Sequence, residues 1–317
     1  MTLWGKPIKP MLAETGEPFD DEDWIFEIKF DGTRAIAFVD RNSVKLQNRR
    51  LLDITHRYPE LTLNKDVKGR VILDGEIVVL HNGKPDFERL QEREHAEGEA
   101  KIHLLSKEYP AVYIVFDVLE IDGKDVTNET LMERKRLLER TVKESERLLI
   151  SEYVEARGKK FFREVQKLGL EGVMAKRKDS KYEIGKRSKN WLKIKNLKTI
   201  DCVVCGLTKG KGSRSEYFGS LVLGCYRKGK LVYVGRVGTG FDRRKMEMFM
   251  RVFERLRTRE CPFPSKPSFE SGIELAYWVR PEIVVEVEFL ELTKDMKLRA
   301  PSLRRIRNDK EPGECVI

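Results

Sequence analysis

Residues 24–39 read Trp-Ile-Phe-Glu-Ile-Lys-Phe-Asp-Gly-Thr-Arg-Ala-Ile-Ala-Phe-Val. The β-branched and aromatic side chains of 24–26 and 35–39 predict two strands, and Asp31-Gly32 predicts a turn between them. Lys29 is therefore expected at a strand end, beside a tight turn and between apolar side chains. A lysine amine attacks only in its neutral form, which an apolar site with other cations nearby favours. Lys29 is our candidate covalent nucleophile, and a surface lysine on a hairpin is the plainer alternative.

The composition indicates one or two globular domains, because 317 residues are ample for sizeable cores. No stretch approaches about 18 apolar residues and the N-terminus lacks the apolar core of a signal peptide, so we expect neither a membrane span nor a leader. The five cysteines form no paired framework, which suits a reducing cytosol. The C-x-x-C pair Cys202 and Cys205 has no second pair to complete a zinc site, and we expect both to be small buried apolar side chains.

The positive charge is confined to the middle of the sequence. Residues 151–250 hold 25 Lys and Arg against 10 Asp and Glu, a net charge of +15, whereas residues 1–150 carry −6 and residues 251–317 carry +1. A basic surface concentrated in one region favours a polyanionic partner, with nucleic acid the leading case. A solvated charged face is the alternative.

The rest of the sequence predicts an α+β protein in two parts. Up to about residue 197 we expect strands at 44–48, 71–80, 111–119, 171–176 and 191–195, helices at 131–142 and 159–168, and a charged helix followed by a loop within 86–100. Beyond 197 we expect short strands at 202–207, 220–226, 231–237 and 283–290, with one helix at about 242–257. Short strands with glycine turns and a single helix suggest a small β-barrel of the OB-fold type.

Five short motifs follow one another in a recognisable order. They are Glu27-x-Lys29-x-Asp31-Gly32-x-Arg34, Asp74-Gly75-Glu76, Phe116-Asp117, Glu171-Gly172-Val173-Met174-Ala175-Lys176 and Trp191-Leu192-Lys193-Ile194-Lys195. The set resembles the covalent nucleotidyltransferases: ATP-dependent DNA ligases, RNA ligases and mRNA capping enzymes. Residues 298–310 resemble the last motif of DNA ligases, and residues 86–91, 182–195 and 233–241 look like the ligase domain of the end-joining ligase D family.

The resemblance implies a nucleotidyltransferase (adenylation) domain of antiparallel sheets with helices, residues 1–197, and an OB-fold domain, residues 198–317. It also implies a role for each matching residue. Lys29 would hold AMP, and Glu76 and Glu171 would hold Mg²⁺ or Mn²⁺. The residues implied to bind the nucleotide are Glu27 and Phe116 at the adenine, Arg34 and Arg49 at the sugar or phosphate, and Arg187, Lys193 and Lys195 at the α-phosphate. Arg307 and Lys310 would meet the pyrophosphate that leaves.

The implied reaction is the sealing of nicked or broken duplex DNA with ATP as the AMP donor. We expect a monomer, with Ku and separate polymerase and phosphoesterase chains as partners, since no such domain and no helical N-terminal DNA-binding domain is expected in this sequence. Two alternatives stay open. An RNA ligase or capping guanylyltransferase would share the lysine motif, and an inactive nucleic-acid-binding scaffold would explain the basic region.

Overall fold

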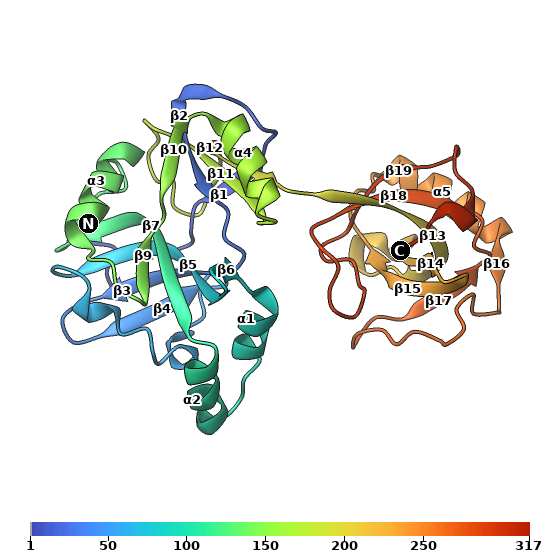
Figure 1. Ribbon diagram of the computed structural model, residues 1–317, viewed down its shortest axis with the longest axis horizontal. Coiled ribbons are helices and arrows are strands. Elements are labelled where there is room, and N and C mark those ends of the chain that lie inside the picture. Colours follow the sequence, from blue (N-terminus) through green and yellow to red (C-terminus); the bar gives the residue numbers. More distant parts are fainter. Residues whose placement is uncertain (1) are drawn as a thin grey trace. The chain divides into compact units, whose positions relative to one another are not determined.

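The computed structural model describes residues 2–317, which fall into two compact units, one ending at Asn196 and the other beginning at Leu197 (Figure 1). Among residues 2–196 the first unit contains two β-sheets and four α-helices, and residues 197–317 form one curled sheet and one α-helix. None of the helices within residues 2–317 is both long and apolar enough to cross a bilayer.

The first sheet of the first unit has five strands in the order β1-β12-β11-β2-β10. Their bounds are β1 Leu12–Thr15, β2 Asp21–Ile28, β10 Tyr153–Ala156, β11 Gly172–Arg177 and β12 Arg187–Lys195. β1 runs parallel to β12, and the other neighbours are antiparallel. This sheet therefore brings β2, the strand that directly precedes Lys29, next to β11, with Glu27 opposite Met174.

The second sheet is built around β5, which pairs with β3 on one side and β7 on the other. Its strands are β3 Thr33–Val39, β4 Val44–Asn48, β5 Val71–His81, β6 Lys84–Pro85, β7 Ala111–Ile121, β8 Lys124–Asp125 and β9 Leu148–Ile150. β5 is apolar on both faces because both are covered: Leu73 packs into one hydrophobic cluster and Ile72 into another. The pairing of β9 with β7 is parallel.

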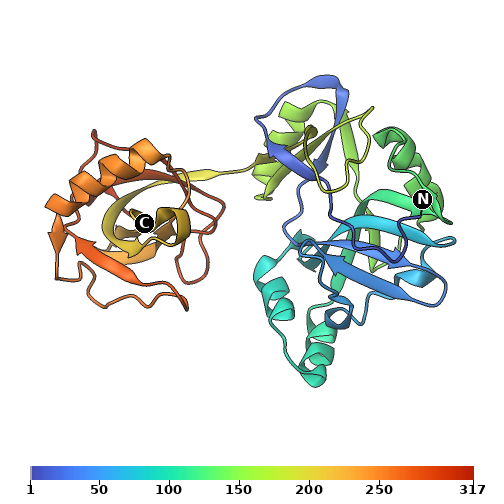
Figure 2. The same cartoon turned by 180° about the vertical axis from the view of Figure 1, so that it is seen from behind.

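Four helices complete the first unit: α1 Phe87–Glu94, α2 Glu99–Glu108, α3 Leu131–Thr141 and α4 Gly158–Lys167. α1 and α2 project from the lower end of the unit in both views (Figures 1 and 2). α3 is capped by Thr130, whose hydroxyl accepts from the Glu133 N–H, as is usual for an N-cap residue. α3 buries Arg134 and Lys135 as well as Leu138, so its inner face carries charge toward the interior.

The two sheets meet across one apolar cluster, which we call the inter-sheet cluster. Its buried members are Ile8, Met11, Ala13, Ile36, Phe38, Ile72, Leu119, Tyr182 and Trp191. Ile36 and Ile72 come from the second sheet, whereas Trp191 comes from β12 of the first. The chain itself crosses from the first sheet to the second between Ile28 and Thr33, so β2 and β3 flank a turn without pairing with each other.

The second unit is a curled sheet in which the long strand β13 has three partners. Its elements are β13 Lys198–Lys209, β14 Phe218–Arg227, β15 Lys230–Val237, α5 Arg243–Arg255, β16 Arg257–Thr258, β17 Leu275–Val279, β18 Val284–Phe289 and β19 Ser302–Ile306. β13 pairs with β14 along one edge, and with β18 and then β17 along the other. The Leu298 N–H donates to Val234 O of β15 at 2.8 Å, which draws the segment before β19 against the far side of the curl.

Cys202 and Cys205 are fully buried on β13 and pack into different apolar clusters of this unit, as small apolar side chains. β13 is therefore apolar on both faces, because a different hydrophobic cluster covers each of them.

Candidate active site

Lys29 follows the last residue of β2, and two contacts fix it there. Its backbone N–H donates to Gly172 O at 2.9 Å, and its ammonium forms an ion pair and hydrogen bond with Glu171. The side chain of Lys29 is 21% exposed and that of Glu171 only 8%. Lys29 is therefore partly exposed and lines a cavity, described below, with Glu171 as its acidic partner.

Two glycines make this arrangement possible. A Cβ on Gly32 would lie 2.3 Å from Ile77 O and 2.8 Å from the Glu76 side chain, so only glycine lets the turn pack against β5. Gly172 has a φ of +151°, and a Cβ there would lie 2.2 Å from Ile194 O. The glycines of the first and fourth motifs therefore hold Lys29 beside Glu76 and Glu171.

The cavity beside Lys29 has a volume of about 230 Å³ and combines aromatic walls with cations. It is lined by Leu12, Ala13, Glu27, Ile28, Lys29, Phe30, Arg34, Arg49, Glu76, Phe116, Met174, Lys176, Arg187, Trp191 and Lys193. Phe116 on β7 and Trp191 on β12 meet edge to face with ring centroids 6.1 Å apart. Among residues 2–317 the buried indole N–H of Trp191 has no acceptor. The walls are thus suited to a flat ring with polar edges.

A buried charge cluster closes the inner end of the cavity. Glu27 is 1% exposed and forms ion pairs with both Lys135 of α3 and Lys176 of β11, the latter at 2.7 Å. The Lys176 ammonium lies 4.2 Å from the centroid of the Phe116 ring. Burial lowers the pKa of Lys176 to about 8, the Glu27 carboxylate opposes that shift, and Lys135 adds to it. One carboxylate against two ammonium groups leaves the cluster with an excess positive charge.

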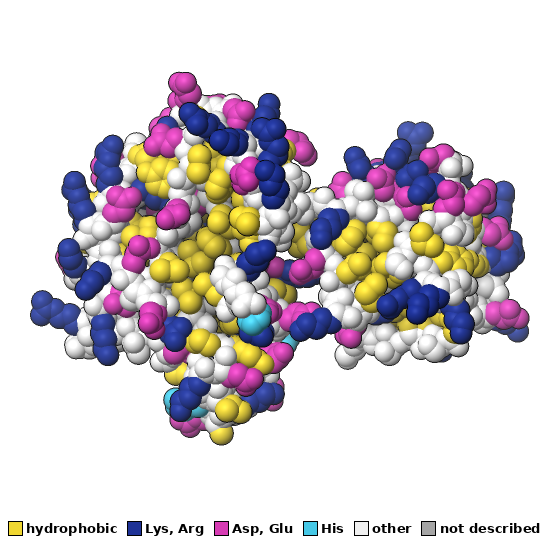
Figure 3. Space-filling view, in the orientation of Figure 1, with side chains coloured by type: hydrophobic (Ala, Val, Ile, Leu, Met, Phe, Trp, Pro, Cys, Tyr) yellow, Lys and Arg dark blue, Asp and Glu magenta, His cyan; other side chains and the backbone are white. Residues whose placement is uncertain are grey.

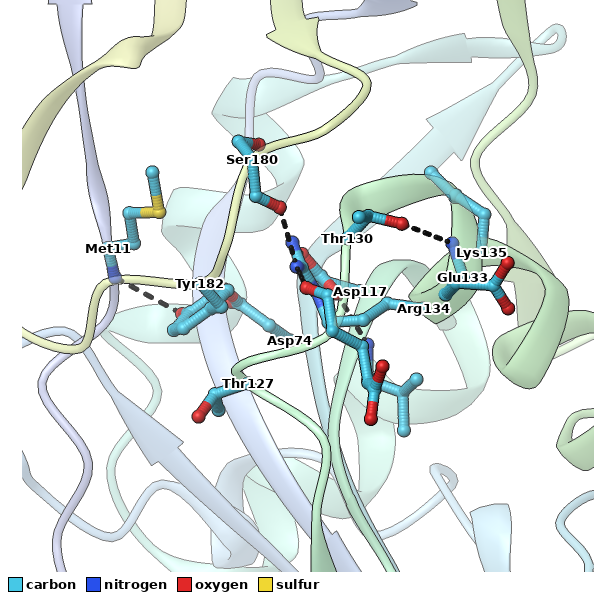
Figure 4. Close-up of polar contacts among 12 residues, drawn as sticks. Met11, Asp74, Asp117, Thr127, Thr130, Glu133, Arg134, Lys135, Ser180 and Tyr182 are labelled. Carbon is cyan, nitrogen blue, oxygen red and sulfur yellow. Dashed lines mark hydrogen bonds and ion pairs between the residues drawn. The ribbon is translucent and has the colours of Figure 1, made fainter.

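A buried network anchors Arg34 beside these walls. Arg34 donates to both oxygens of Asp74, at 3.0 and 2.6 Å. The Tyr182 hydroxyl donates to Asp74 at 2.6 Å and accepts from the Met11 N–H at 3.1 Å (Figure 4). Asp74 is fully buried, so these contacts supply the partners that a buried carboxylate requires. The Arg34 side chain is thereby held at one place on the cavity wall.

A second buried pair fixes the strand that carries Phe116. Arg134 of α3 donates to both oxygens of Asp117 at 2.7 and 2.9 Å, and to Ser180 O at 2.9 Å (Figure 4). Arg134 and Asp117 are both fully buried. The position of the Phe116 ring, one residue before Asp117, is therefore fixed by this ion pair as well as by packing.

Several cations converge on the outer end of the cavity. Burial lowers the pKa of Lys193, and the nearby charges of Arg187, Lys195, Lys29 and Arg49 lower it further. Arg187 is oriented by donating to Ala13 O at 2.5 Å. Arg49, Arg187 and Lys193 line the cavity, whereas Lys195, two residues further along β12, does not. This end is suited to phosphate oxygens.

Glu76 and Glu171 could supply two of the ligands of a divalent cation. Burial raises the pKa of Glu76 to about 8, Lys29 and Arg34 oppose the shift, and Glu171 adds to it. No group of three or more His, Cys, Asp or Glu side chains in residues 2–317 could hold a metal ion. Mg²⁺ is often held by only one or two carboxylates, with water and substrate phosphates completing its shell, and these two residues match that arrangement.

Arg307 and Lys310 lie in the second unit, where both contact Asp201 of β13. Arg307 Nη1 lies 3.0 Å from Asp201 Oδ1, and Lys310 Nζ lies 2.9 Å from Oδ2. Arg307 also donates to both oxygens of Asp309, at 2.9 and 2.8 Å. These two cations are thus held as a pair within their own unit.

Several residues that complete this site were not expected from the sequence. Lys176 and Trp191 lie inside two of the five motifs, so their motif positions were an available signal. Lys135 carries no such signal, because a lysine in a charged helix is normally solvated. Asp74 was visible as a carboxylate in an apolar strand, but its partner Tyr182 lies 108 residues away in the sequence.

Two family models match the chain. The model described as "ATP dependent DNA ligase domain" matches residues 8–195, and "ATP dependent DNA ligase C terminal region" matches residues 214–310. The chain is 35% identical over 314 residues to a multifunctional non-homologous end joining protein, LigD, of Mycobacterium bovis, covering 98% of this chain and 40% of that protein. It is 32% identical over 335 residues to a DNA ligase of Thermococcus fumicolans, covering 98% of this chain and 57% of that protein.

Solved structures show the same similarity. The ligase domain of LigD from M. tuberculosis is 33% identical, with a TM-score of 0.53 and 98% of each chain covered. A mycobacterial DNA ligase D complexed with ATP is also 33% identical, with a TM-score of 0.55 and 98% of each chain covered. Against the full-length relatives above, the chain spans about two fifths of the mycobacterial protein and little more than half of the Thermococcus one.

Proposed function

Because this chain belongs to the ATP-dependent DNA ligase family, we propose that it joins breaks in duplex DNA through AMP bound covalently to Lys29. The observation that carries the proposal is the cavity itself. One wall offers Phe116 and Trp191 to a base, the other end gathers cations for phosphates, and Lys29 stands at the mouth. A solvated surface lysine would have no such surroundings.

In the first step the Lys29 nitrogen attacks the α-phosphorus of ATP. The adenine lies against Phe116, and Glu27 and Lys176 face its polar edge. A bond forms between nitrogen and phosphorus, the bond to the bridging oxygen breaks, and pyrophosphate leaves. Glu171 already accepts a hydrogen bond from the ammonium, so it is placed to take the proton that Lys29 loses.

Cations stabilise the charge that develops on the phosphates. Arg49, Arg187 and Lys193 line the outer end of the cavity, and Arg307 and Lys310 are proposed to meet the pyrophosphate. Lys195, outside the lining, would act at longer range. Glu76 and Glu171 would hold Mg²⁺ or Mn²⁺, which would supply further positive charge at the phosphate oxygens.

In the later steps AMP passes to the 5′-phosphate at a break, and the 3′-hydroxyl then displaces it and closes the strand. Lys and Arg side chains are spread over the visible face of both units, with Asp and Glu between them (Figure 3). The excess of +15 in residues 151–250 supplies the attraction for the DNA backbone. The LigD relatives are named for non-homologous end joining, which supports broken DNA ends as the cellular substrate, and we propose Ku as a partner at those ends.

The alternatives of an RNA ligase, a capping guanylyltransferase or an inactive scaffold receive less support. Both family models are those of ATP-dependent DNA ligases. Lys29, Glu76 and several cations line one cavity, and Glu171 is paired with Lys29 beside it.

The test is incubation with ATP labelled at the α-phosphate, followed by intact-protein mass measurement. We expect one AMP on the wild type and none on Lys29→Ala. Lys178→Ala is the matched control, because Lys178 follows the end of strand β11 and is also paired with a glutamate, Glu155, but lies outside the cavity. It should carry AMP normally. A normal adduct on Lys29→Ala would refute the assignment, and sealing of nicked DNA by the wild type tests the later steps.

A further inference from the structure

Arg307 and Lys310 share a single carboxylate. Arg307 Nη1 lies 3.0 and 3.1 Å from the two oxygens of Asp201, and Lys310 Nζ lies 2.9 Å from Oδ2. Both cationic nitrogens are thus close to one oxygen atom. The side chains of Asp201 and Arg307 are each 15% exposed and that of Lys310 is 30% exposed, so the contact is partly shielded from water.

Asp201 is well anchored to serve as this common point. It lies on β13 directly opposite Glu286 of β18, and Glu286 lies opposite Arg305 of β19. Arg307 prolongs the β19 pairing, since its N–H donates to Val284 O at 2.9 Å. The carboxylate therefore projects from β13, which β18 joins to β19, whereas Lys310 lies in the segment that follows β19.

The other acidic partner, Asp309, cannot play the same part. It is two residues from Arg307, 66% exposed, and contacts Arg307 without reaching Lys310. Two cations held close together repel each other, and a lysine side chain has many rotamers of similar energy. Asp201 offsets the repulsion and limits the rotamers of both side chains.

We propose that Asp201 is a positioning residue that presents Arg307 and Lys310 together to the pyrophosphate in the first step. The inference rests on the proposed function, because it needs these cations to act on the leaving group. Loss of the carboxylate charge should leave both cations in the protein but spread over several positions. Misplacement of this kind reduces rates by roughly 10- to 100-fold.

The test separates the step that involves pyrophosphate from the step that does not. Asp201→Asn should slow AMP transfer to Lys29 by roughly 10- to 100-fold, and leave the sealing of a nick whose 5′-phosphate already carries AMP unchanged. The reverse reaction gives a direct readout. A pyrophosphate oxygen attacks the AMP phosphorus, the bond to Lys29 breaks, Lys29 takes up a proton and ATP forms. Asp201→Asn should need a higher pyrophosphate concentration for half-maximal release of AMP.

Two further variants make the outcome specific. Glu286→Gln is the matched control, because Glu286 lies opposite Asp201 but pairs with Arg304 and Arg305. In this variant both AMP transfer to Lys29 and the sealing of a pre-adenylated nick should run at the wild-type rate. Asp201→Glu keeps the charge and should recover the first step to within a few-fold of the wild type. Melting temperatures of all variants report any loss of fold.

Several results would overturn the inference: equal slowing of both steps in Asp201→Asn, an unchanged or faster first step, or an Asp201→Glu variant as slow as Asp201→Asn. If the wild type takes up no AMP at all, the proposed function falls and this inference with it. If the wild type takes up AMP and Arg307→Ala slows that step while Asp201→Asn does not, only this inference falls.

Discussion

The buried ammonium of Lys176 should make the stability of the first unit depend on alkaline pH. Its pKa is lowered to about 8 by burial, and the groups that face it are Glu27 of β2, Lys135 of α3 and Asp117 of β7. In the unfolded chain the pKa returns to its ordinary value of about 10.4. Below pH 8 the side chain is charged in both states, and folding bears the full cost of burying that charge.

As pH rises from 8 to about 10.4, the folded state releases its proton before the unfolded state does, so the free energy of unfolding increases. A pKa of about 8 in place of about 10.4 corresponds to about 3 kcal/mol. The rings of Phe116 and Trp191, with centroids 4.2 and 4.4 Å from the ammonium, favour its charged form by about 1 kcal/mol each. We therefore expect a gain of between about 1 and 3 kcal/mol.

The assay compares urea unfolding of the wild type and Lys176→Met from pH 7 to pH 10.5. Methionine keeps the volume and cannot titrate, so other alkaline effects cancel in the difference between the two proteins. That difference should shift in favour of the wild type as pH rises through 8. Lys178→Met, which changes a half-buried lysine just past the end of β11, should follow the wild-type curve throughout. A difference that stays flat or moves the other way would refute the reasoning.

Three further outcomes can be checked. The double variant Arg307→Ala, Lys310→Ala should slow AMP transfer to Lys29 by roughly 10²-fold, since removing one such contact often has that effect. It should still seal pre-adenylated nicks at the normal rate. Rapid-quench kinetics measure the two steps, and equal slowing of both would contradict the assigned role. Arg134→Met should lower the free energy of unfolding by about 3–5 kcal/mol, because it leaves the buried Asp117 charge without a partner; adding Asp117→Asn should restore part of the loss, and urea unfolding measures both. The affinity for nicked duplex DNA should fall with salt, with a slope of roughly −1 per neutralised phosphate when the logarithm of the affinity is plotted against the logarithm of the salt concentration. Titrations at several salt concentrations measure this slope. An affinity that did not change with salt would show that the basic region does not bind the DNA backbone.

The fold class was predictable because the motifs carry the family's identity, and the comparisons confirm both the DNA ligase family and the two-part α+β architecture. Local patterns also located most elements: the strand expected at 44–48 is β4 as observed, and the helix expected at 242–257 is α5. The helix and loop expected within 86–100 correspond to α1 and the residues that follow it, but a second helix, α2, begins at Glu99 and was not expected. The apolar side chains of α2 form no single stripe, since Leu105 is buried and Leu104 is 63% exposed. Helical periodicity therefore did not predict this helix.

Pairing was harder to predict than the strands themselves. The turn at Asp31-Gly32 suggested neighbouring strands, but β2 and β3 belong to different sheets, because alternation shows which residues share a face and not which strand lies alongside. The sheets expected to be antiparallel also contain the parallel pairs β1–β12 and β7–β9. Strands β17 and β19 went unrecognised, the latter because Arg304 and Arg305 interrupt any alternation.

The composition of the cavity was largely foreseen, since most of the expected nucleotide-binding residues line it. Their roles remain predictions. What pattern reasoning could not supply is the set of buried partners, Lys135 for Glu27 and Arg134 for Asp117. Such pairs depend on a helix docking onto a strand far away in the chain, and a charged helix looks the same in sequence whether its inner face is buried or solvated.

The crossing of the chain between its two sheets also affects how this protein can vary over generations. Lys29 stands on that crossing, with Trp191 and Lys176 on one sheet and Phe116 on the other. The inter-sheet cluster sets how the two halves meet, so a methyl group gained or lost at Ile36 or Ile72 would tilt one half against the other. Substitutions among ordinary aliphatic side chains outside the cavity lining are therefore a route by which the rate of the proposed reaction could change during evolution.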